Sequence, residues 1–205
     1  MCGRYLIAED EKYFDEIGNI VNEISQKSVK SISAGAREVF PTNYTPVIYQ
    51  YNGKNILSSA KWGFPGFKNK GVIINARAET IAEKQMFKGP FAEKRCIIPA
   101  NGYYEWLTRE DGKKIKYLIR VSDKNLFYMA GLYNIFKDKN EDPYAAVAII
   151  TTRANPEISF IHDRMPVILP DMSVRDWLDA DNRDPFRLKS LLVPYSAGKM
   201  EYMVA

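Results

Sequence analysis

Two Gly-containing dipeptides constrain the fold of this chain more than any other feature of its sequence. Asn52-Gly53 and Asp111-Gly112 each separate two runs that are rich in β-branched and aromatic residues. Asn-Gly and Asp-Gly pairs favour the tight turns of β-hairpins, because Asn, Asp and Gly adopt a positive φ at low cost. Further strand-like runs, bounded by Gly, Pro or Asn, cover residues 95–107, 125–136, 144–152 and 164–169. The sequence therefore predicts a mostly antiparallel sheet.

Helical periodicity is confined to a few segments. Apolar residues recur at three- and four-residue steps between Glu9 and Gln26, which predicts one amphipathic helix. Short helices are predicted over residues 79–87 and 173–180, and a third is predicted to start near Asn155, which can cap it. The expected fold class is α+β, with a mostly antiparallel, barrel-like β core and peripheral helices.

The length of the chain favours one domain. Its 205 residues, 46% of them hydrophobic, suffice for one packed core and are few for two. No internal repeat or Gly-, Ser- or Pro-rich linker divides the sequence, so a single domain over residues 1–205 is expected. The formal net charge of +4 is compatible with an anion-binding groove but does not require one.

The first residues lack the features of a secretory leader, because they have no apolar core and become acidic within ten positions. The longest apolar run, residues 144–150, is too short to span a bilayer. We therefore expect a cytoplasmic protein whose two cysteines, Cys2 and Cys96, are free thiols.

Cys2 has a special chemistry if the initiator methionine is removed. It then carries an α-amine and a thiol on adjacent carbons. At neutral pH the reactive neutral fraction of an α-amine exceeds that of a lysine roughly 300-fold. Such an amine forms an imine with an aldehyde, and the tethered thiol can close a five-membered thiazolidine ring. Two alternatives are an ordinary second residue and the thiol nucleophile of a glutamine amidotransferase, whose domains also begin Met-Cys-Gly.

Three later segments place polar groups in apolar surroundings, where such groups need a partner or a task. The segments are residues 74–80, 98–106 and 161–169, and their polar residues are Asn75, Arg77, Glu79, Glu105, His162, Asp163 and Arg164. The structural alternative is a buried network that joins Arg77 or Arg164 to Glu79 or Asp163. His162 is the single histidine, and the two cysteines have no zinc-binding spacing, so neither a metal nor a cofactor is expected.

Together these motifs resemble those of the SOS response-associated peptidase (SRAP) family. The similarity runs in order from Cys2 to about Trp177, and its motifs are MCGRY, the Pro41-Thr42 pair, WGF, NARAET, RCIIPANGYYEW, AGLYN, ITTRAN and IHDRMPVIL.

The resemblance implies a sensor of abasic sites in single-stranded DNA that crosslinks covalently to the ring-opened sugar and shields the lesion. It assigns the nucleophile to Cys2, positioning to Asn75, acid–base work to Glu105, and proton transfer with crosslink reversal to His162. Its peptidase activity would be self-removal of Met1, and general proteolysis is not expected. A carboxyl beside Tyr103, Tyr104 and Trp106 should be partly desolvated, which raises its pKa.

DNA contacts are also implied by the resemblance. Phosphates suit the guanidinium groups of Arg4, Arg77 and Arg164 and the hydroxyl or amide of Thr151. The Pro41-Thr42 pair is assigned to the same interface, and bases are expected to stack on Trp62, Phe67 or Trp106. Either a core position or a base contact fits Trp62. Many relatives have a second tryptophan after the first Trp-Gly, and in this chain Phe67 is expected to substitute for it. The expected partner is abasic single-stranded DNA of the chromosome, bound by a monomer.

Two other functions compete with this one. The amidotransferase alternative requires an Asn-Gly-Glu loop and an Arg-Gly-Pro segment, and the sequence contains neither. A noncovalent single-strand binder with an incidental cysteine stays open, and its binding would weaken steeply with salt.

Overall fold

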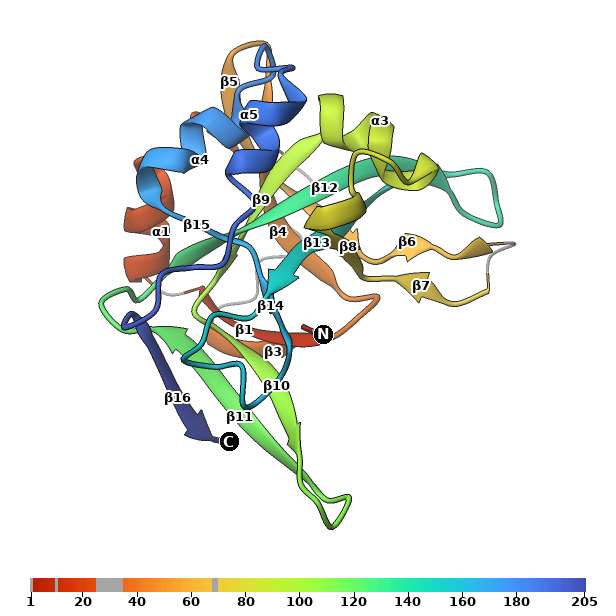
Figure 1. Cartoon of the computed structure of the whole chain (residues 1–205). Coiled ribbons are helices and arrows are strands. Elements are labelled where there is room, and N and C mark those ends of the chain that lie inside the picture. Colours follow the sequence, from red (N-terminus) through yellow and green to blue (C-terminus); the bar gives the residue numbers. More distant parts are fainter. Residues whose placement is uncertain (1, 10, 25–34, 68–69) are drawn as a thin grey trace.

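Five strands close into a barrel in the computed structural model, which describes residues 2–9, 11–24, 35–67 and 70–205. The barrel strands are β4 (Tyr44–Tyr51), β5 (Lys54–Trp62), β9 (Arg95–Ala100), β12 (Phe127–Lys137) and β13 (Pro143–Arg153). Neighbours pair antiparallel in the order β13-β12-β9-β4-β5, and a parallel pairing of β5 with β13 completes the ring. Figure 1 shows this barrel at the centre of the molecule.

A second, five-stranded antiparallel sheet lies beside the barrel in the order β16-β11-β10-β1-β3. Its strands are β1 (Arg4–Glu9), β3 (Gly35–Val39), β10 (Gly102–Thr108), β11 (Lys114–Val121) and β16 (Met200–Val204). The two sheets meet where β9 continues into β10 at Asn101. The amide side chain of Asn101 accepts a hydrogen bond from the Ala8 N–H and donates one to the Asn125 carbonyl, which fixes this junction.

Short strands extend the barrel. β14 (Arg164–Pro166) and β8 (Asn75–Arg77) both pair with β13, β15 (Ile168–Leu169) pairs with β12, and β2 (Glu23–Ile24) pairs with β5. β6 (Phe64–Pro65) and β7 (Val72–Ile73) form a separate two-stranded ribbon. The expected α+β fold with a mostly antiparallel, barrel-like core is confirmed, and one cluster of buried apolar side chains includes residues of both sheets.

Both predicted hairpins form, with different turns. Asn52 and Gly53 both have positive φ, 49° and 73°, as a two-residue type I′ turn between β4 and β5 requires. In the β10–β11 hairpin only Gly112 has a positive φ, 77°, and the Arg109 N–H donates to the Lys113 carbonyl around a longer loop.

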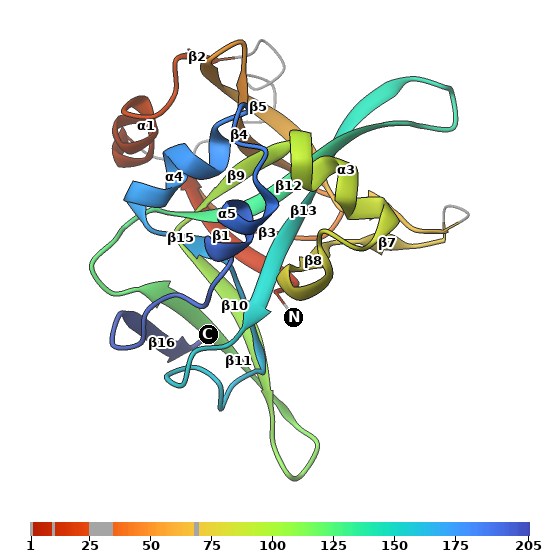
Figure 2. The ribbon, with the colours of Figure 1, turned by 45° about the horizontal axis from the view of Figure 1, so that its top comes forward.

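The helices lie around the barrel, and the first of them is shorter than the periodicity predicts. Figures 1 and 2 show α3, α4 and α5 on one side of it, with α1 next to α4. Their bounds are α1 (Glu11–Gly18), α3 (Gln85–Glu93), α4 (Asp171–Leu178) and α5 (Pro185–Ser190), with a 3₁₀ turn, η2, at Ala78–Thr80. None of the helices in the described residues is long and apolar enough to cross a membrane.

The helix predicted between Glu9 and Gln26 is wrong at both ends. Glu9 belongs to β1, the helix stops at Gly18, and residues 10, 25 and 26 lie outside the described part. Beyond Gly18, the Asn22 side chain accepts a hydrogen bond from the Asn55 N–H, and the chain then pairs with β5. Tertiary pairing therefore overrides the local helical period.

Three further helix predictions need correction. The helix expected over residues 79–87 is split, because Lys84 is extended and α3 starts only at Gln85. Asn155 does accept a hydrogen bond from the Ile158 N–H as predicted, but only turns follow it. The helix expected over residues 173–180 is α4, which begins two residues earlier, at Asp171.

A buried arginine holds two helices against the barrel. Arg95, at the start of β9, donates hydrogen bonds of 2.5–3.0 Å to the carbonyl oxygens of Phe91, Ala92, Trp177, Asp179 and Asn182. These carbonyls lie at the C-terminal ends of α3 and α4, or just beyond, where the helix dipole favours a cation and carbonyls lack helical partners.

We expect Arg95→Lys to destabilise the protein by about 3 kcal/mol, since a lysine cannot reproduce the planar fork and leaves carbonyls without a donor. Urea unfolding measures this change. The exposed Arg109→Lys is the control and should change the free energy of unfolding by less than about 0.5 kcal/mol. Equal stability of both variants would contradict the role given to Arg95.

Candidate active site around Cys2

Cys2 lies just ahead of β1 and is held between β1 and β8. Its side chain is fully buried, and its thiol donates a long hydrogen bond of 3.8 Å to the Arg4 carbonyl. The Asn75 side-chain amide donates to the Cys2 carbonyl at 2.9 Å. Since Asn75 begins β8, and β8 pairs with β13, the barrel itself fixes the backbone of Cys2.

Burial favours the neutral form of the Cys2 thiol. Burial raises the pKa of the thiol far above its ordinary value, and the Glu105 carboxylate raises this pKa further. A thiol has to lose its proton to act as a nucleophile, so reaction at this sulfur needs a nearby proton acceptor.

Glu105 is the candidate for this proton acceptor. It lies on β10, it is buried, and burial raises its pKa above the ordinary value, as the sequence predicts. The positive charge of His162, when present, lowers the same pKa and so opposes part of the effect. A carboxyl with a raised pKa can both accept and donate a proton near neutral pH, which is the property of a general acid–base group.

Tyr103 shares this environment and was not a predicted site residue. Its ring is fully buried, and its hydroxyl makes no hydrogen bond within the described part of the chain. Burial raises the pKa of Tyr103 well above its ordinary value, and the charges of Cys2 and Glu105 add to this rise. Strand alternation could have revealed it, because positions 103 and 105 of one strand face the same side.

The same alternation corrects the expected neighbours of Glu105. Tyr104 and Trp106 point to the other face of the sheet: the Arg4 guanidinium lies 5.4 Å from the Trp106 ring centroid, and the Lys116 ammonium lies 3.9 Å from that of Tyr104. Of the three aromatic residues expected beside the carboxyl, only Tyr103 lies on its face.

His162 lies on the turn before β14. Its Nδ1 accepts a hydrogen bond of 3.0 Å from the Arg164 N–H, which requires an unprotonated Nδ1. The same atom is 2.8 Å from an Asp163 carboxylate oxygen, a contact that is favourable only when Nδ1 carries a proton. The two contacts exclude each other at Nδ1, because one needs the lone pair of this atom and the other needs a proton on it.

An ion pair anchors the strand that follows His162. Arg164 donates to both oxygens of Glu79, at 2.6 and 3.0 Å, and to the Thr151 carbonyl at 2.7 Å. The predicted pairing of Arg164 with Glu79 therefore forms, but the network is not fully buried, because the Glu79 side chain is 43% exposed. Arg164 and Thr151 are both buried and Arg164 is bound within the protein, so their contact with a DNA phosphate stays a prediction.

The chain is similar in sequence to known proteins over nearly its whole length. The family model "SOS response associated peptidase (SRAP)" matches residues 1–204. The chain belongs to the SRAP family. The abasic site processing protein YoqW of Bacillus subtilis (strain 168) is 39% identical over 206 residues, which cover 98% of this chain and 90% of YoqW.

Other relatives agree with this assignment. The abasic site processing protein YobE of the same bacterium is 37% identical and covers 98% of this chain and 92% of its own. A crystal structure of a protein from Bacteroides thetaiotaomicron is 29% identical, with a TM-score of 0.84 over 99% of this chain and 91% of that chain.

The remaining SRAP residues that the sequence assigns to DNA are divided between surface and core. Arg77, Thr42 and Phe67 are exposed, Phe67 by 81%, while Arg4, Pro41 and Trp106 are partly exposed. Trp62 is fully buried, and its indole N–H donates to the Ile74 carbonyl at 3.0 Å. Trp62 is thus a core residue of this SRAP barrel and offers no ring face to a base.

Within the described residues of this SRAP chain, no group of three or more His, Cys, Asp and Glu side chains is arranged to hold a metal ion.

The Glu79–Arg164 pair predicts a pH-dependent stability. The hydrogen bond from Arg164 is the main factor that lowers the pKa of Glu79 below its ordinary value, so the stabilisation is present above about pH 4.5 and is lost as the pH falls through the lowered pKa. Glu79→Gln should therefore lower the Tm at neutral pH, and this deficit should shrink on acidification. Thermal unfolding followed by circular dichroism between about pH 7 and about pH 3 measures it.

The control for this experiment is Glu83→Gln, an exposed acid four residues away. It should leave the Tm nearly unchanged at each pH. A Glu79→Gln deficit that stays constant across the range would mean that the pair does not titrate as described.

Proposed function

We propose that this protein recognises abasic sites in single-stranded DNA and forms a covalent thiazolidine crosslink with them through Cys2, after removal of Met1. The observation that carries the proposal is the confinement of the Cys2 thiol, the Asn75 amide and the Glu105 carboxyl to one buried place in an SRAP fold. The abasic site processing activity in the names of YoqW and YobE supports it.

The thiazolidine crosslink would form in two steps. The α-amine of Cys2 adds to the aldehyde of the ring-opened sugar and expels water, which leaves an imine. The S–H bond then adds across the C=N bond: sulfur bonds to carbon, and the proton ends on nitrogen. Glu105 would shuttle the protons of both steps, and His162 would protonate the departing sugar oxygen and assist reversal.

The positions of Asn75 and Tyr103 fit supporting roles. Asn75 holds the Cys2 carbonyl through its amide nitrogen, while its Oδ1 is buried with no hydrogen-bond partner in the described part. The Tyr103 hydroxyl is buried and likewise lacks a partner there. A buried polar atom without a partner costs stability. The Asn75 Oδ1 and the Tyr103 hydroxyl are therefore suited to bind a sugar hydroxyl, or the α-amine that Cys2 carries once Met1 is removed. Because the sulfur is buried, the site has to open before a sugar carbon can reach it.

Contacts to the DNA strand would come from the exposed and partly exposed residues. Arg77 and Arg4 suit phosphates, and Phe67 and Trp106 offer ring surface for bases on either side of the lesion. Pro41 and Thr42 lie on the loop between β3 and β4, where Thr42 has a positive φ of 73° and its N–H donates to the Trp62 carbonyl. We propose that this loop borders the bound strand.

Cys2→Ala should abolish the covalent adduct. The assay incubates protein with a uracil-containing oligonucleotide treated with uracil glycosylase, and it scores a shifted band on a denaturing gel. Cys96→Ala is the matched control, since it removes the other buried free cysteine and should keep the band. A band that persists in Cys2→Ala, or its absence from the native protein, would refute the crosslinking function and leave the noncovalent binder.

Glu105→Gln should slow crosslinking by about 100-fold or more, because a general acid–base group contributes that much. The same variant should be more stable than the native protein at neutral pH. The raised pKa means that ionisation of Glu105 costs stability, increasingly as the pH rises from the ordinary carboxyl range through the raised value. Single-turnover gel kinetics and Tm measurements test the two effects.

Glu110→Gln at the tip of the β10–β11 hairpin is the control for both measurements, since Glu110 is exposed. A loss of rate accompanied by a lower Tm would assign Glu105 to folding and not to the reaction.

A further inference from the structure

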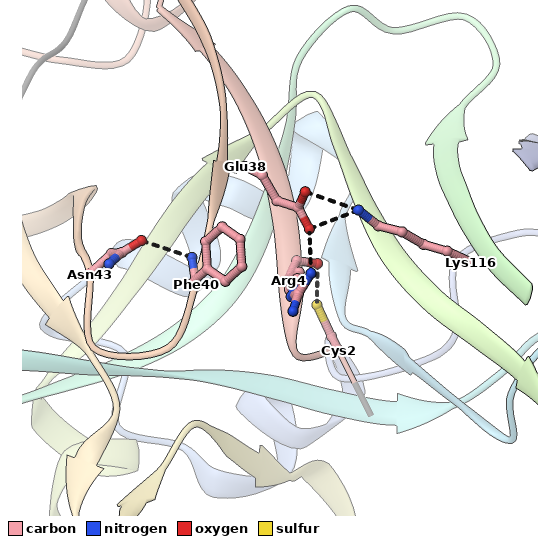
Figure 3. Close-up of polar contacts among 6 residues, drawn as sticks. All are labelled: Cys2, Arg4, Glu38, Phe40, Asn43 and Lys116. Atoms are coloured by element: carbon pink, nitrogen blue, oxygen red, sulfur yellow. Dashed lines mark hydrogen bonds and ion pairs between the residues drawn. The ribbon is translucent and has the colours of Figure 1, made fainter. Parts of the chain in front are cut away.

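One carboxylate joins two cations on the face of the second sheet that lies opposite Glu105. Glu38 on β3 accepts hydrogen bonds from the Lys116 ammonium, at 2.9 Å to each oxygen, and one of 3.3 Å from the Arg4 guanidinium. Figure 3 shows the Glu38 carboxylate between the two basic side chains. All three side chains are between 24% and 38% exposed, so solvent reaches the group.

Aromatic rings surround these charges. The Arg4 guanidinium lies 4.4 Å from the Phe40 ring centroid and 5.4 Å from that of Trp106. Strand register produces this gathering, because Arg4 pairs with Tyr104 and Trp106 pairs with Lys116 across neighbouring strands. Phe40 is 40% exposed, so part of its ring is open to a stacking partner.

The group is adjacent to the candidate nucleophile. The Arg4 carbonyl accepts the Cys2 thiol hydrogen bond, so the Arg4 backbone touches the reactive residue while its side chain lies in the basic cluster (Figure 3). A strand with its lesion at Cys2 would pass around this end of β1 to reach the Arg4 side chain on the other face of the sheet.

We propose that the Glu38 carboxylate occupies, in the free protein, the place that a DNA phosphate takes between Arg4 and Lys116, and that the incoming phosphate displaces it. This inference rests on the proposed function and adds Glu38, Phe40 and Lys116 to its interface. Carboxylate and phosphate oxygens accept the same charge-assisted hydrogen bonds from guanidinium and ammonium groups.

Solvent exposure makes the exchange feasible. The Glu38 and Lys116 side chains are 24% and 25% exposed, so separating them costs more than separating a fully exposed pair, but the incoming phosphate replaces the hydrogen bonds that both cations lose. In the Arg164–Glu79 pair the arginine is the buried partner, because the Arg164 side chain is 10% exposed and the Glu79 side chain is 43% exposed. Glu38 is thus a built-in competitor that weakens binding to every strand, damaged or not, and leaves discrimination to the covalent step at Cys2.

The test measures noncovalent binding of an undamaged single-stranded oligonucleotide by fluorescence anisotropy at several salt concentrations. Glu38→Gln should bind about three- to tenfold more tightly at low salt, since two weak ion pairs no longer compete. Its affinity should also fall more steeply with salt. Without Glu38, the Arg4 and Lys116 side chains hold counterions in the free protein, and these counterions are released when the phosphate binds. Lys116→Met in the native background should bind more weakly and with a shallower salt slope.

Asp176→Asn is the matched control. It removes one negative charge from an ion pair with Arg187 on the helices α4 and α5, so the net charge changes equally. It should change the affinity less than twofold. Equal effects of Glu38→Gln and Asp176→Asn would reduce the result to net charge and overturn the inference, as would unchanged or weaker binding by folded Glu38→Gln, or unchanged binding by Lys116→Met.

The native protein's crosslinking assay separates the two proposals. If it traps abasic DNA while Glu38→Gln binds no better, only the exchange at Glu38 is wrong. If it traps none, the proposed function itself is wrong, whatever the binding data show.

Discussion

The pairing of β13 with four other strands is the constraint on which the rest of the structure depends. β13 pairs with β12 and β14 antiparallel and with β5 and β8 parallel, so one strand closes the barrel and carries the short strands of the site. β8 brings Asn75 to the Cys2 carbonyl, and β14 brings Arg164 to Glu79. Local contacts at the N-terminus would not hold Cys2 in place without this long-range pairing.

The second sheet separates two kinds of chemistry by strand alternation alone. On one face of β10, Tyr103 and Glu105 are buried with Cys2, and burial raises the pKa of all three side chains. On the other face, Tyr104 and Trp106 meet the cations of Arg4 and Lys116 in contact with solvent. A strand of seven residues thus presents a carboxyl and a phenol group to the interior and two aromatic rings to the cations on its other face.

Local patterns predicted the hairpins, the strands and the family, because turn preferences and sequence motifs depend on residues that are adjacent in the chain. The sequence could not show that Ile24 would pair with Leu57 in a strand and not continue a helix, because that choice depends on β5. Nor could it decide whether Trp62 and Arg164 face the core or the solvent, since burial follows from barrel closure. The assignment of roles to Cys2, Asn75, Glu105 and His162 came from resemblance, and their chemical roles stay predictions.

The burial of Cys2 also affects how the protein meets oxidants. Peroxide and most electrophiles attack exposed thiolates, and a buried neutral thiol is a poor target for them. The fold therefore protects the Cys2 sulfur from oxidants in the solvent. Oxidation of this sulfur should therefore depend on how often the structure around Cys2 opens, and less on the concentration of oxidant around the protein.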